Sequence, residues 1–260
     1  MKIAVCIKAV PDTETKIAIA SDKKHIETAG VKYVTNPYDE FAVEEALKIK
    51  EKHGGEVTGF SLGGAEVNDV LKNCLARGLD TAIHLKDDLF LDLDPLSTAI
   101  CLAAAIRDQN FDIVLCGQQG VGGDNNQVPS ILAEILNLPQ VNLIVKLEIE
   151  GNKFKAEREI EGAREVIQGE LPVVFSAQKD LNTPRYPSIK EIMAAKRKEI
   201  ATKNVQDLGV AKDMAQTKNQ LVLQELSLPP ARPAGRKLEG TADEQVKQLV
   251  QALRNEAKVI

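Results

Sequence analysis

One stretch of sixteen residues, Leu115 to Ser130, constrains the fold of this chain most. An apolar segment, Phe111 to Cys116, runs into a loop with four glycines, and an apolar-periodic segment begins after Pro129. A buried strand, a glycine-rich loop and a helix are expected in that order, because glycine permits positive φ and proline fits a first helical turn. The N–H groups of a helix start lack intrahelical partners and lie at the positive end of the dipole. The stretch is a candidate phosphate site; the alternative is a flexible loop with an ordinary helix cap.

The glycine spacing matches neither G-x-G-x-x-G nor G-x-x-x-x-G-K-[ST], which disfavours the usual NAD fingerprint and a P-loop. A formal net charge of −5 argues against nucleic-acid binding. The longest nearly apolar run, Ala99 to Ile106, is too short to span a bilayer, and Met1 to Val5 predicts a strand, not a signal peptide. We expect a cytoplasmic protein that is not embedded in a membrane, with an organelle matrix as the alternative location.

The cysteines and histidines show no spacing typical of metal ligands, and no pair of cysteines forms C-x-x-C. Cys6, Cys74, Cys101 and Cys116 are widely separated in apolar segments, so we interpret them as buried or half-buried thiols. We expect neither a metal site nor a catalytic residue on this chain.

Residues 1 to about 138 alternate strand-like and helix-like segments. Asn36-Pro37 opens a helix that ends at Gly54-Gly55, since Asn is favoured at the N-cap and Pro at the first helical position. This alternation predicts a parallel sheet with helices on both faces. Ligands of such sheets bind at the carboxyl ends of the strands.

The pattern changes after Pro139. Val141 to Glu150 and Lys153 to Glu161, joined by Gly151-Asn152, predict an antiparallel hairpin. Residues 201–240 are polar, poorly periodic and contain Pro229-Pro230, Pro233 and Gly235, and Asp243 to Asn255 predicts an amphipathic helix. We therefore expect a nucleotide-binding α/β domain over residues 1–200 and an extended C-terminal arm over 201–260. The arm helix is expected to pack on a partner subunit; the alternative is a mobile tail with a marginal helix.

Four stretches, in this order and spacing, resemble the β subunits of electron transfer flavoproteins. The resemblance runs from Lys2 to about Ile200 and extends more weakly into the arm. It implies a doubly wound, mainly parallel α/β sheet of the adenine nucleotide α-hydrolase kind, with added antiparallel strands and a C-terminal arm that ends in a helix. The stretches are Cys6-Ile7-Lys8, N-P-Y-D-E-F-A-V-E-E-A at Asn36 to Ala46, G-Q-Q-G-V-G-G-D-N-N-Q-V at Gly117 to Val128, and A-E-R-E-I-E-G-A at Ala156 to Ala163, which continues into L-P-V-V-F-S-A and L-N-T-P-R-Y-P-S-I.

This resemblance implies an electron-carrier subunit that forms a heterodimer with an α subunit. The α subunit of that family holds most of the FAD, and the β subunit buries AMP as a structural ligand. Electrons arrive from flavin dehydrogenases such as the acyl-CoA dehydrogenases of fatty acid β-oxidation, and leave to a membrane-bound quinone oxidoreductase or another acceptor. An electron-bifurcating subunit, with a second FAD that reacts with NADH in place of AMP, is the main alternative. A stand-alone nucleotide sensor or hydrolase is a third.

The resemblance also implies which residues surround the nucleotide. Asp124 is expected to face the ribose or to shape the loop, and Asn126, Gln127 and Val128 to contact the phosphate through side-chain amides and backbone N–H groups. Asn36 can serve as a helix N-cap and line the pocket at once. The implied set is Cys6, Asn36, Pro37, Tyr38, Asp39, Leu62, Gly117, Gln118, Gly120, Val121, Gly122, Gly123, Asp124, Asn125, Asn126, Gln127 and Val128.

Three further residues are expected at interfaces. The resemblance places Glu159 near the flavin of the α subunit, with Arg158 supporting the interface; the alternative is a pair of solvated strand charges. Ile189 occupies the position of an apolar anchor on the family's recognition loop, which docks on partner dehydrogenases. The alternative is a helix-start residue packed on its own domain.

The chain departs from the family pattern in its main loop. Gly122-Gly123-Asp124 stands where AMP-binding members carry three acids, and Gln127 is followed by Val128-Pro129. The Gln-Val pair is similar to the bifurcating branch, whereas Asn126 is similar to the AMP branch. Thr13 stands where some members carry an aromatic residue that contacts the flavin. Both nucleotides therefore stay open at this point.

Overall fold

The computed structural model describes residues 1–211, 219–231 and 234–260. Its centre is a sheet whose strands, within these ranges, lie in the order β11-β5-β4-β1-β6-β10-β7-β8-β9. Neighbouring strands pair parallel from β11 to β7, and β8 joins β7 and β9 antiparallel. The strands are β1 (Lys2–Cys6), β4 (Glu56–Leu62), β5 (Thr81–Leu85), β6 (Ile113–Gly117), β7 (Gln140–Glu150), β8 (Lys153–Ile160), β9 (Ala163–Glu170), β10 (Val173–Ala177) and β11 (Ala201–Lys203).

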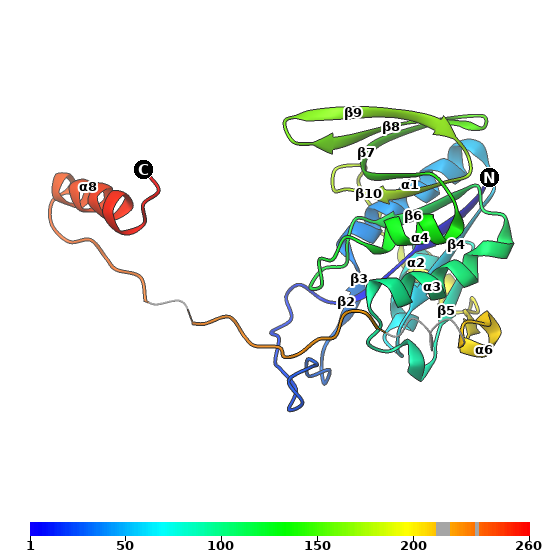
Figure 1. Ribbon diagram of the computed structural model, residues 1–260, viewed down its shortest axis with the longest axis horizontal. Helices are drawn as coiled ribbons and strands as arrows, with labels where there is room; N and C mark the ends of the chain where they lie inside the picture. The colour runs from blue at the N-terminus through cyan, green and yellow to red at the C-terminus, as the bar shows by residue number, and fades with distance from the viewer. Residues whose placement is uncertain (212–218, 232–233) are drawn as a thin grey trace.

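Helices cover both faces of the parallel strands (Figure 1). α1 and α2 contribute to one buried apolar cluster, and α3, α4 and α6 contribute to the other. This arrangement confirms the predicted doubly wound, mainly parallel α/β fold with added antiparallel strands. The helices are α1 (Pro37–His53), α2 (Val67–Arg77), α3 (Pro95–Ile106), α4 (Val128–Leu136), α5 (Ile189–Ala195), α6 (Val205–Leu208) and α8 (Ala242–Gln251), with short 3₁₀ turns at Asp88–Phe90 and Arg107–Gln109.

The first strand shows why the sheet must be covered on both sides. Side chains alternate across a strand, so Ile3 and Val5 join the cluster under α1 and α2, while Ala4 and Cys6 join the cluster under α3. All four are buried. A strand that is apolar at every position suits only the middle of a parallel sheet.

The strand order creates a switch point between β1 and β6. From β1 the chain moves outward to β4 and β5, and it then returns to the other side of β1 to form β6 and β10. The connections that follow β1 and β6 therefore lead in opposite directions. A crevice opens at the carboxyl ends of two such strands, and ligands of doubly wound sheets bind there.

Helix α1 begins and ends where the sequence predicts. Asn36 is its N-cap, Pro37 its first residue, and Gly54 its C-cap with φ of 72°. The Gly54 N–H donates to the Lys50 carbonyl at 2.8 Å, which closes the last turn. The side chain of Asn36, however, makes no capping hydrogen bond to the helix, because other partners hold it.

The antiparallel strands extend the sheet beyond its helical cover. Gly151, with φ of 60°, turns the chain between β7 and β8, as the Gly-Asn pair predicts. Phe154 of β8 packs edge-on against Phe175 of β10, with ring centroids 5.1 Å apart. A two-stranded ribbon of β2 (Ala9–Pro11) and β3 (Tyr33–Thr35) was not predicted, because three-residue strands show no measurable periodicity.

The C-terminal region divides into a packed and an unpacked part. β11 pairs with β5, and Val205 and Val210 are buried, so the residues just after 200 belong to the body of the protein. Residues 219–226 are still bonded to the body at Asp94 and Lys23, and the described chain beyond them leads to α8, which stands apart from the body and has no buried residue (Figure 1). The division at residue 200 and the packing of the arm on a partner stay predictions.

Length and polarity of the helices bear on membrane insertion. In the described part of the chain, none of them combines the length and the apolar character that crossing a bilayer requires. The expected cytoplasmic location stays a prediction.

Candidate functional site

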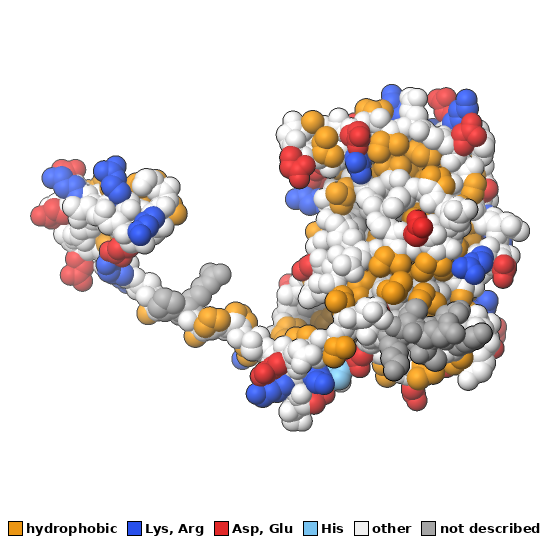
Figure 2. Space-filling view, viewed as in Figure 1, with side chains coloured by type: hydrophobic (Ala, Val, Ile, Leu, Met, Phe, Trp, Pro, Cys, Tyr) orange, Lys and Arg blue, Asp and Glu red, His pale blue; other side chains and the backbone are white. Residues whose placement is uncertain are grey.

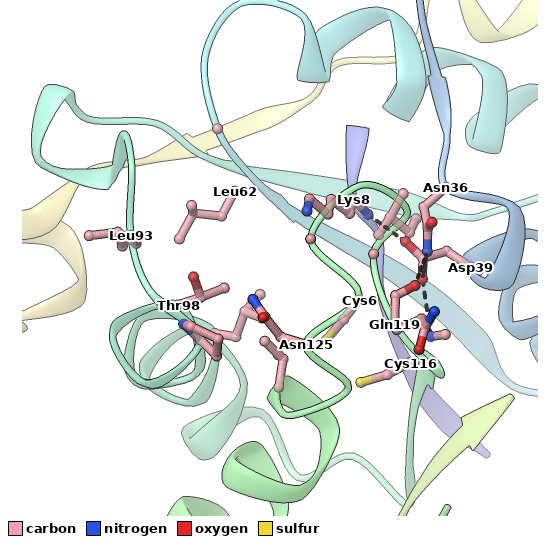
Figure 3. A pocket seen from close by; sticks show the side chains of 18 of the residues that line it. Cys6, Lys8, Asn36, Asp39, Leu62, Leu93, Thr98, Cys116, Gln119 and Asn125 are labelled. Atoms are coloured by element: carbon pink, nitrogen blue, oxygen red, sulfur yellow. Dashed lines mark hydrogen bonds between the residues drawn. The ribbon is translucent and has the colours of Figure 1, made fainter. Parts of the chain in front are cut away.

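A cavity of about 490 Å³ opens at the carboxyl ends of β1, β4 and β6. The end of β1 with Cys6 forms its floor, the loop after β6 one wall, and the segment between β5 and α3 the opposite wall (Figure 3). Its position is the one that the switch point between β1 and β6 favours. Its volume lies in the range of about 300–1,000 Å³ that small-molecule sites span.

A hydrogen-bond junction joins the end of β1, the start of α1 and the loop after β6. The buried Asp39 carboxylate accepts the backbone N–H groups of Lys8 at 2.7 Å and Gly117 at 3.1 Å. It also accepts the Asn36 side-chain amide at 2.9 Å. Asn36 in turn donates to the Gln119 carbonyl at 2.8 Å (Figure 3). These bonds fix the loop against the helix start.

The same junction explains why Asn36 caps α1 by position only. Besides its two donated bonds, the Asn36 side-chain oxygen accepts the Val121 N–H at 3.1 Å. With 1% of its surface exposed, Asn36 is fully engaged within the protein. Its side chain thus shapes the wall of the cavity, and the predicted N-cap role and pocket-lining role are both compatible with this position.

Glycine is required where the loop touches the helix start. A Cβ on Gly117 would lie 2.2 Å from Asp39 Oδ1 and 2.7 Å from the Asp39 backbone nitrogen. Neither atom can move without breaking the junction. Side chains at this position are therefore excluded by close backbone approach, and not by backbone dihedral angles.

Burial has a large effect on the pKa values of the ionisable groups at the junction and on the cavity floor. Desolvation raises the pKa of Asp39 to about 7, and the three hydrogen-bond donors act in the opposite direction. On the cavity floor, the neighbouring Cys6 thiol and burial hold the pKa of Cys116 well above its ordinary value. All four cysteines are buried, which confirms their interpretation as buried thiols.

The middle of the loop turns through left-handed conformations. Gly122 has φ of 93°, Asp124 of 47° and Asn126 of 52°. Short polar side chains tolerate this region better than others do. Asp124 accepts a hydrogen bond from the Gln119 side chain at 2.9 Å, and its N–H donates to the Gly120 carbonyl at 2.9 Å. Asp124 therefore shapes the loop, which is one of its two predicted roles, and the loop leads directly into α4.

The opposite wall is mainly apolar and was missed by sequence reasoning. Apolar side chains there come from the segment between β5 and α3 and from α3 itself. Asp94 caps α3 through the Ser97 N–H at 2.8 Å and so fixes the end of this wall. The rule that ligands collect at strand ends also applies to β5, and could have pointed to this segment. The missed residues include Phe90, Leu91, Leu93, Pro95, Thr98 and Leu102 here, and Lys8 and Gln119 on the other side.

Most of the residues expected around a nucleotide line this cavity together. The exceptions are Pro37, Tyr38, Val121 and Gly122, which lie in the same segments but not on the lining surface. Val121 still contributes through its bond to Asn36. The residues that do line the cavity are Cys6, Asn36, Asp39, Leu62, Gly117, Gln118, Gly120, Gly123, Asp124, Asn125, Asn126, Gln127 and Val128.

The three residues expected at interfaces lie elsewhere. Arg158 and Glu159 are on β8, where Arg158 pairs with Glu165 of β9 at 2.6 Å and Glu159 lies 3.7 Å from Arg164. Ile189 is the first residue of α5 and has 83% of its surface exposed. It is not packed on its own domain. Within the described ranges, no cluster of three His, Cys, Asp or Glu side chains could hold a metal ion.

Comparison with known proteins agrees with this architecture. Residues 24–208 match the family model of the electron transfer flavoprotein domain. The chain is 42% identical to the electron transfer flavoprotein subunit beta of Bacillus subtilis (strain 168), over 100% of both chains. It is 39% identical to the subunit of the same name from Syntrophomonas wolfei, over 100% of this chain and 98% of that one.

The likeness extends to eukaryotes. The electron transfer flavoprotein subunit beta of Dictyostelium discoideum is 34% identical over 100% of this chain and 99% of its own length. Identity at this level over whole chains, together with the domain match, leaves the family in no doubt. The chain belongs to the electron transfer flavoproteins, among their β subunits.

Proposed function

We propose that this chain forms the β half of a heterodimeric electron carrier and that its cavity holds AMP as a structural ligand. In this proposal the α partner binds most of the FAD, which supplies the redox chemistry when bound. The chain itself binds the nucleotide, supports the partner and offers a docking surface to electron donors. It has no substrate turnover of its own.

The cavity between β1 and β6 carries the proposal. One wall offers backbone N–H groups of a glycine-rich loop and the start of α4, which suit a phosphate. The other wall offers apolar side chains of Phe90, Leu93 and Leu102, which suit a base. A mononucleotide, with one base and one phosphate, suits a cavity of about 490 Å³ with these two walls.

The bifurcating alternative keeps one specific observation in its favour. Gln127 is followed by Val128 at the start of α4, and residues 122–127 are exposed, so the loop does not close the cavity on that side. A second FAD would need such an opening. In that case the chain would be part of an NADH-linked oxidoreductase.

The residues on β8 fit an interface with the α subunit. Arg158 and Glu159 face charges of β9 in this chain, and 52% of the Glu159 side chain is exposed. Positive charge near a flavin stabilises its reduced anionic forms, and a carboxylate opposes them. We propose that Arg158 supports this interface and that Glu159 lies near the flavin.

The loop before α5 is built to present apolar side chains. Arg185 binds both carboxylate oxygens of Glu44, each at 2.9 Å, and so holds the root of the loop on α1. Ser188 and Glu191 form a capping box that fixes the start of α5. Ile189 at this start is exposed. We propose that it docks on flavin dehydrogenases, and that electrons leave to a quinone oxidoreductase or another acceptor.

The nucleotide content of the heterodimer tests the proposal. The chain is co-expressed with its α partner, the complex is purified and denatured, and the released nucleotides are separated by chromatography. One FAD and one AMP per heterodimer are expected. Two FAD and no AMP would favour bifurcation, which an NADH titration would then examine, and a complex without any flavin would refute the proposed carrier function.

A further inference from the structure

Few charged side chains line the cavity, and acidic ones outnumber basic ones. Among the described residues that line it, Lys8 is the one basic residue, whereas Asp39, Glu66, Asp92 and Asp124 are acidic. The net charge of −5 of the whole chain adds no general attraction for anions. An anionic ligand therefore depends on Lys8 and on backbone N–H groups for compensation of its charge.

The backbone of Lys8 is fixed by the junction at the start of α1. Its N–H donates to Asp39 at 2.7 Å, and its carbonyl accepts the Asn36 N–H at 2.9 Å. The side chain leaves this junction in the opposite direction and points toward the side of the cavity with Leu62 (Figure 3). The backbone of Lys8 is therefore fixed, while its side chain stays flexible.

Gly120 makes room for this lysine on the glycine-rich loop. A Cβ on Gly120 would lie 2.7 Å from both Cδ and Nζ of Lys8, so the two segments are in direct contact. Within the described residues, the Lys8 ammonium makes no direct ion pair or hydrogen bond, although its charge lowers the pKa of the buried Asp39. It remains available to a ligand held by the loop.

Asp39 attracts the Lys8 ammonium without a direct ion pair, and the other three carboxylates have partners of their own. Glu66 accepts the Gly64 N–H at 2.8 Å, Asp92 pairs with His25 at 3.0 Å, and Asp124 accepts the Gln119 amide. The Asp39 carboxylate is buried in the junction. The remaining three carboxylates repel any further negative charge that enters the cavity.

We propose that Lys8 is the specificity-determining residue of this cavity: its ammonium compensates the phosphate of a nucleoside monophosphate, and the acidic residues disfavour additional phosphates. The cavity then binds AMP more tightly than ADP or ATP. This inference rests on the proposed function, in which an adenine nucleotide occupies the cavity. Such discrimination needs a repulsive element, because the three ligands share the same base and sugar.

The test uses the heterodimer after its nucleotide has been removed. Adenosine, AMP, ADP and ATP are titrated separately into the unaltered complex and into Lys8→Met, Lys8→Arg and Lys86→Met complexes by calorimetry. In the unaltered complex we expect AMP to bind most tightly. Lys8→Met should weaken AMP about ten- to hundredfold, the usual range for a lost charge-assisted hydrogen bond, and leave adenosine within about threefold. Lys8→Arg should restore most of the AMP affinity, and Lys86→Met, outside the cavity, should change nothing.

A second variant tests the repulsive part independently. Asp124→Asn removes one negative charge, keeps an oxygen for the Gln119 amide, and suits the left-handed backbone at this position. We expect it to raise the affinity for ATP more than the affinity for AMP, and so to reduce the difference between the two. This variant also covers the case in which Lys8→Met does not fold.

The outcomes separate this inference from the function on which it rests. Equal losses of adenosine and AMP affinity in Lys8→Met would show that Lys8 supports the structure of the cavity but does not bind the phosphate, and would overturn the inference. ATP binding as tight as AMP binding in the unaltered complex would overturn it too. A complex that binds no adenine compound at all would overturn the proposed function itself.

Discussion

The body of this protein buries its apolar side chains, whereas its C-terminal arm leaves the apolar side chains of α8 exposed. In the body, β1 buries every side chain from Ile3 to Cys6, and Asp39 and Asn36 find partners for their polar atoms. In the arm, Val246 and Leu249 of α8 are exposed, and the helix stands apart from the body (Figure 1). Figure 2 shows the arm helix at a distance from the body.

This difference shows which part of the fold is complete within one chain. A helix of ten residues is marginal on its own in water, and most helical stability comes from packing of an apolar face. The body provides such packing for α1 to α4, whereas nothing in the described chain provides it for α8. The arm therefore needs a second surface, and the α subunit is our proposed source.

Truncation of the arm should have the largest effect. A chain that ends at Leu226 keeps the hydrogen bonds from Gln220 and Leu221 to Asp94 and from Leu226 to Lys23. We expect it to lose stable association with the α subunit in co-purification, while its own unfolding free energy stays within about 1 kcal/mol of the full chain. Unchanged co-purification would remove the arm from the interface.

A second, longer truncation sharpens the comparison. A chain that ends at Ile200 also loses β11, Val205 and Val210, which belong to the body. Two buried valines at about 1.5–3 kcal/mol each predict a loss of several kcal/mol in chemical denaturation. If both truncated chains were equally stable, the body would end before β11.

Glycine substitutions compare the two regions directly. Gly117→Ala places a Cβ against Asp39 in the body, whereas Gly235→Ala in the arm has no atom within 4 Å. We expect Gly117→Ala to lower the unfolding free energy by about 3 kcal/mol and to reduce bound nucleotide, and Gly235→Ala to change neither by a measurable amount. Urea denaturation and nucleotide content measure both. A tolerated Gly117→Ala would contradict the contact between loop and helix start.

The parts that could be predicted from sequence are those with local causes. Asn36-Pro37 and Gly54 predict α1 because capping and termination act within a few residues. The loop from Gly117 to Val128 is likewise visible as a strand, glycines and a helix start. In both cases residues that are close in sequence indicate the element, although distant residues hold the loop in place.

The parts that could not be predicted depend on contacts between distant segments. Lys8 lines the cavity because β1 lies beside β6, and the wall around Phe90 lines it because β5 lies two strands away from β1. The bonds of Asn36 to the loop after β6 span more than eighty residues. No local pattern reports such pairings.

The pH dependence of stability should distinguish the buried junction from the exposed arm. Burial raises the pKa of Asp39 from its ordinary 3.8 to about 7. The folded state then holds this proton more tightly than the unfolded state does, so the contribution to stability is full below about pH 4 and is lost as the pH rises toward 7. Asp39→Asn should abolish this slope in denaturation curves measured from pH 4 to 8. Asp243→Asn in α8 is the control and should keep it.

The smallest effect is expected at the exposed loop before α5. Ile189→Ala removes an apolar side chain that the body does not bury, so stability and flavin content of the heterodimer should not change. Reduction of the complex by a flavin dehydrogenase should become several-fold slower at low concentrations, as for loss of an apolar anchor. Stopped-flow reduction measures this. Leu89→Ala, another exposed aliphatic change, serves as the control, and equal rates for both variants would exclude Ile189 as the anchor.

Hydrogen–deuterium exchange of this chain, alone and bound to its α subunit, tests the contrast between body and arm most directly. We expect amides of β1, β4 and β6 to be protected in both states, because their strands are buried in the sheet. Amides of α8 should exchange rapidly in the free chain and become protected only in the heterodimer. We expect the body to fold within one chain and α8 to pack only on the α subunit. Protection of α8 in the free chain, or rapid exchange of α8 in the heterodimer, would contradict this.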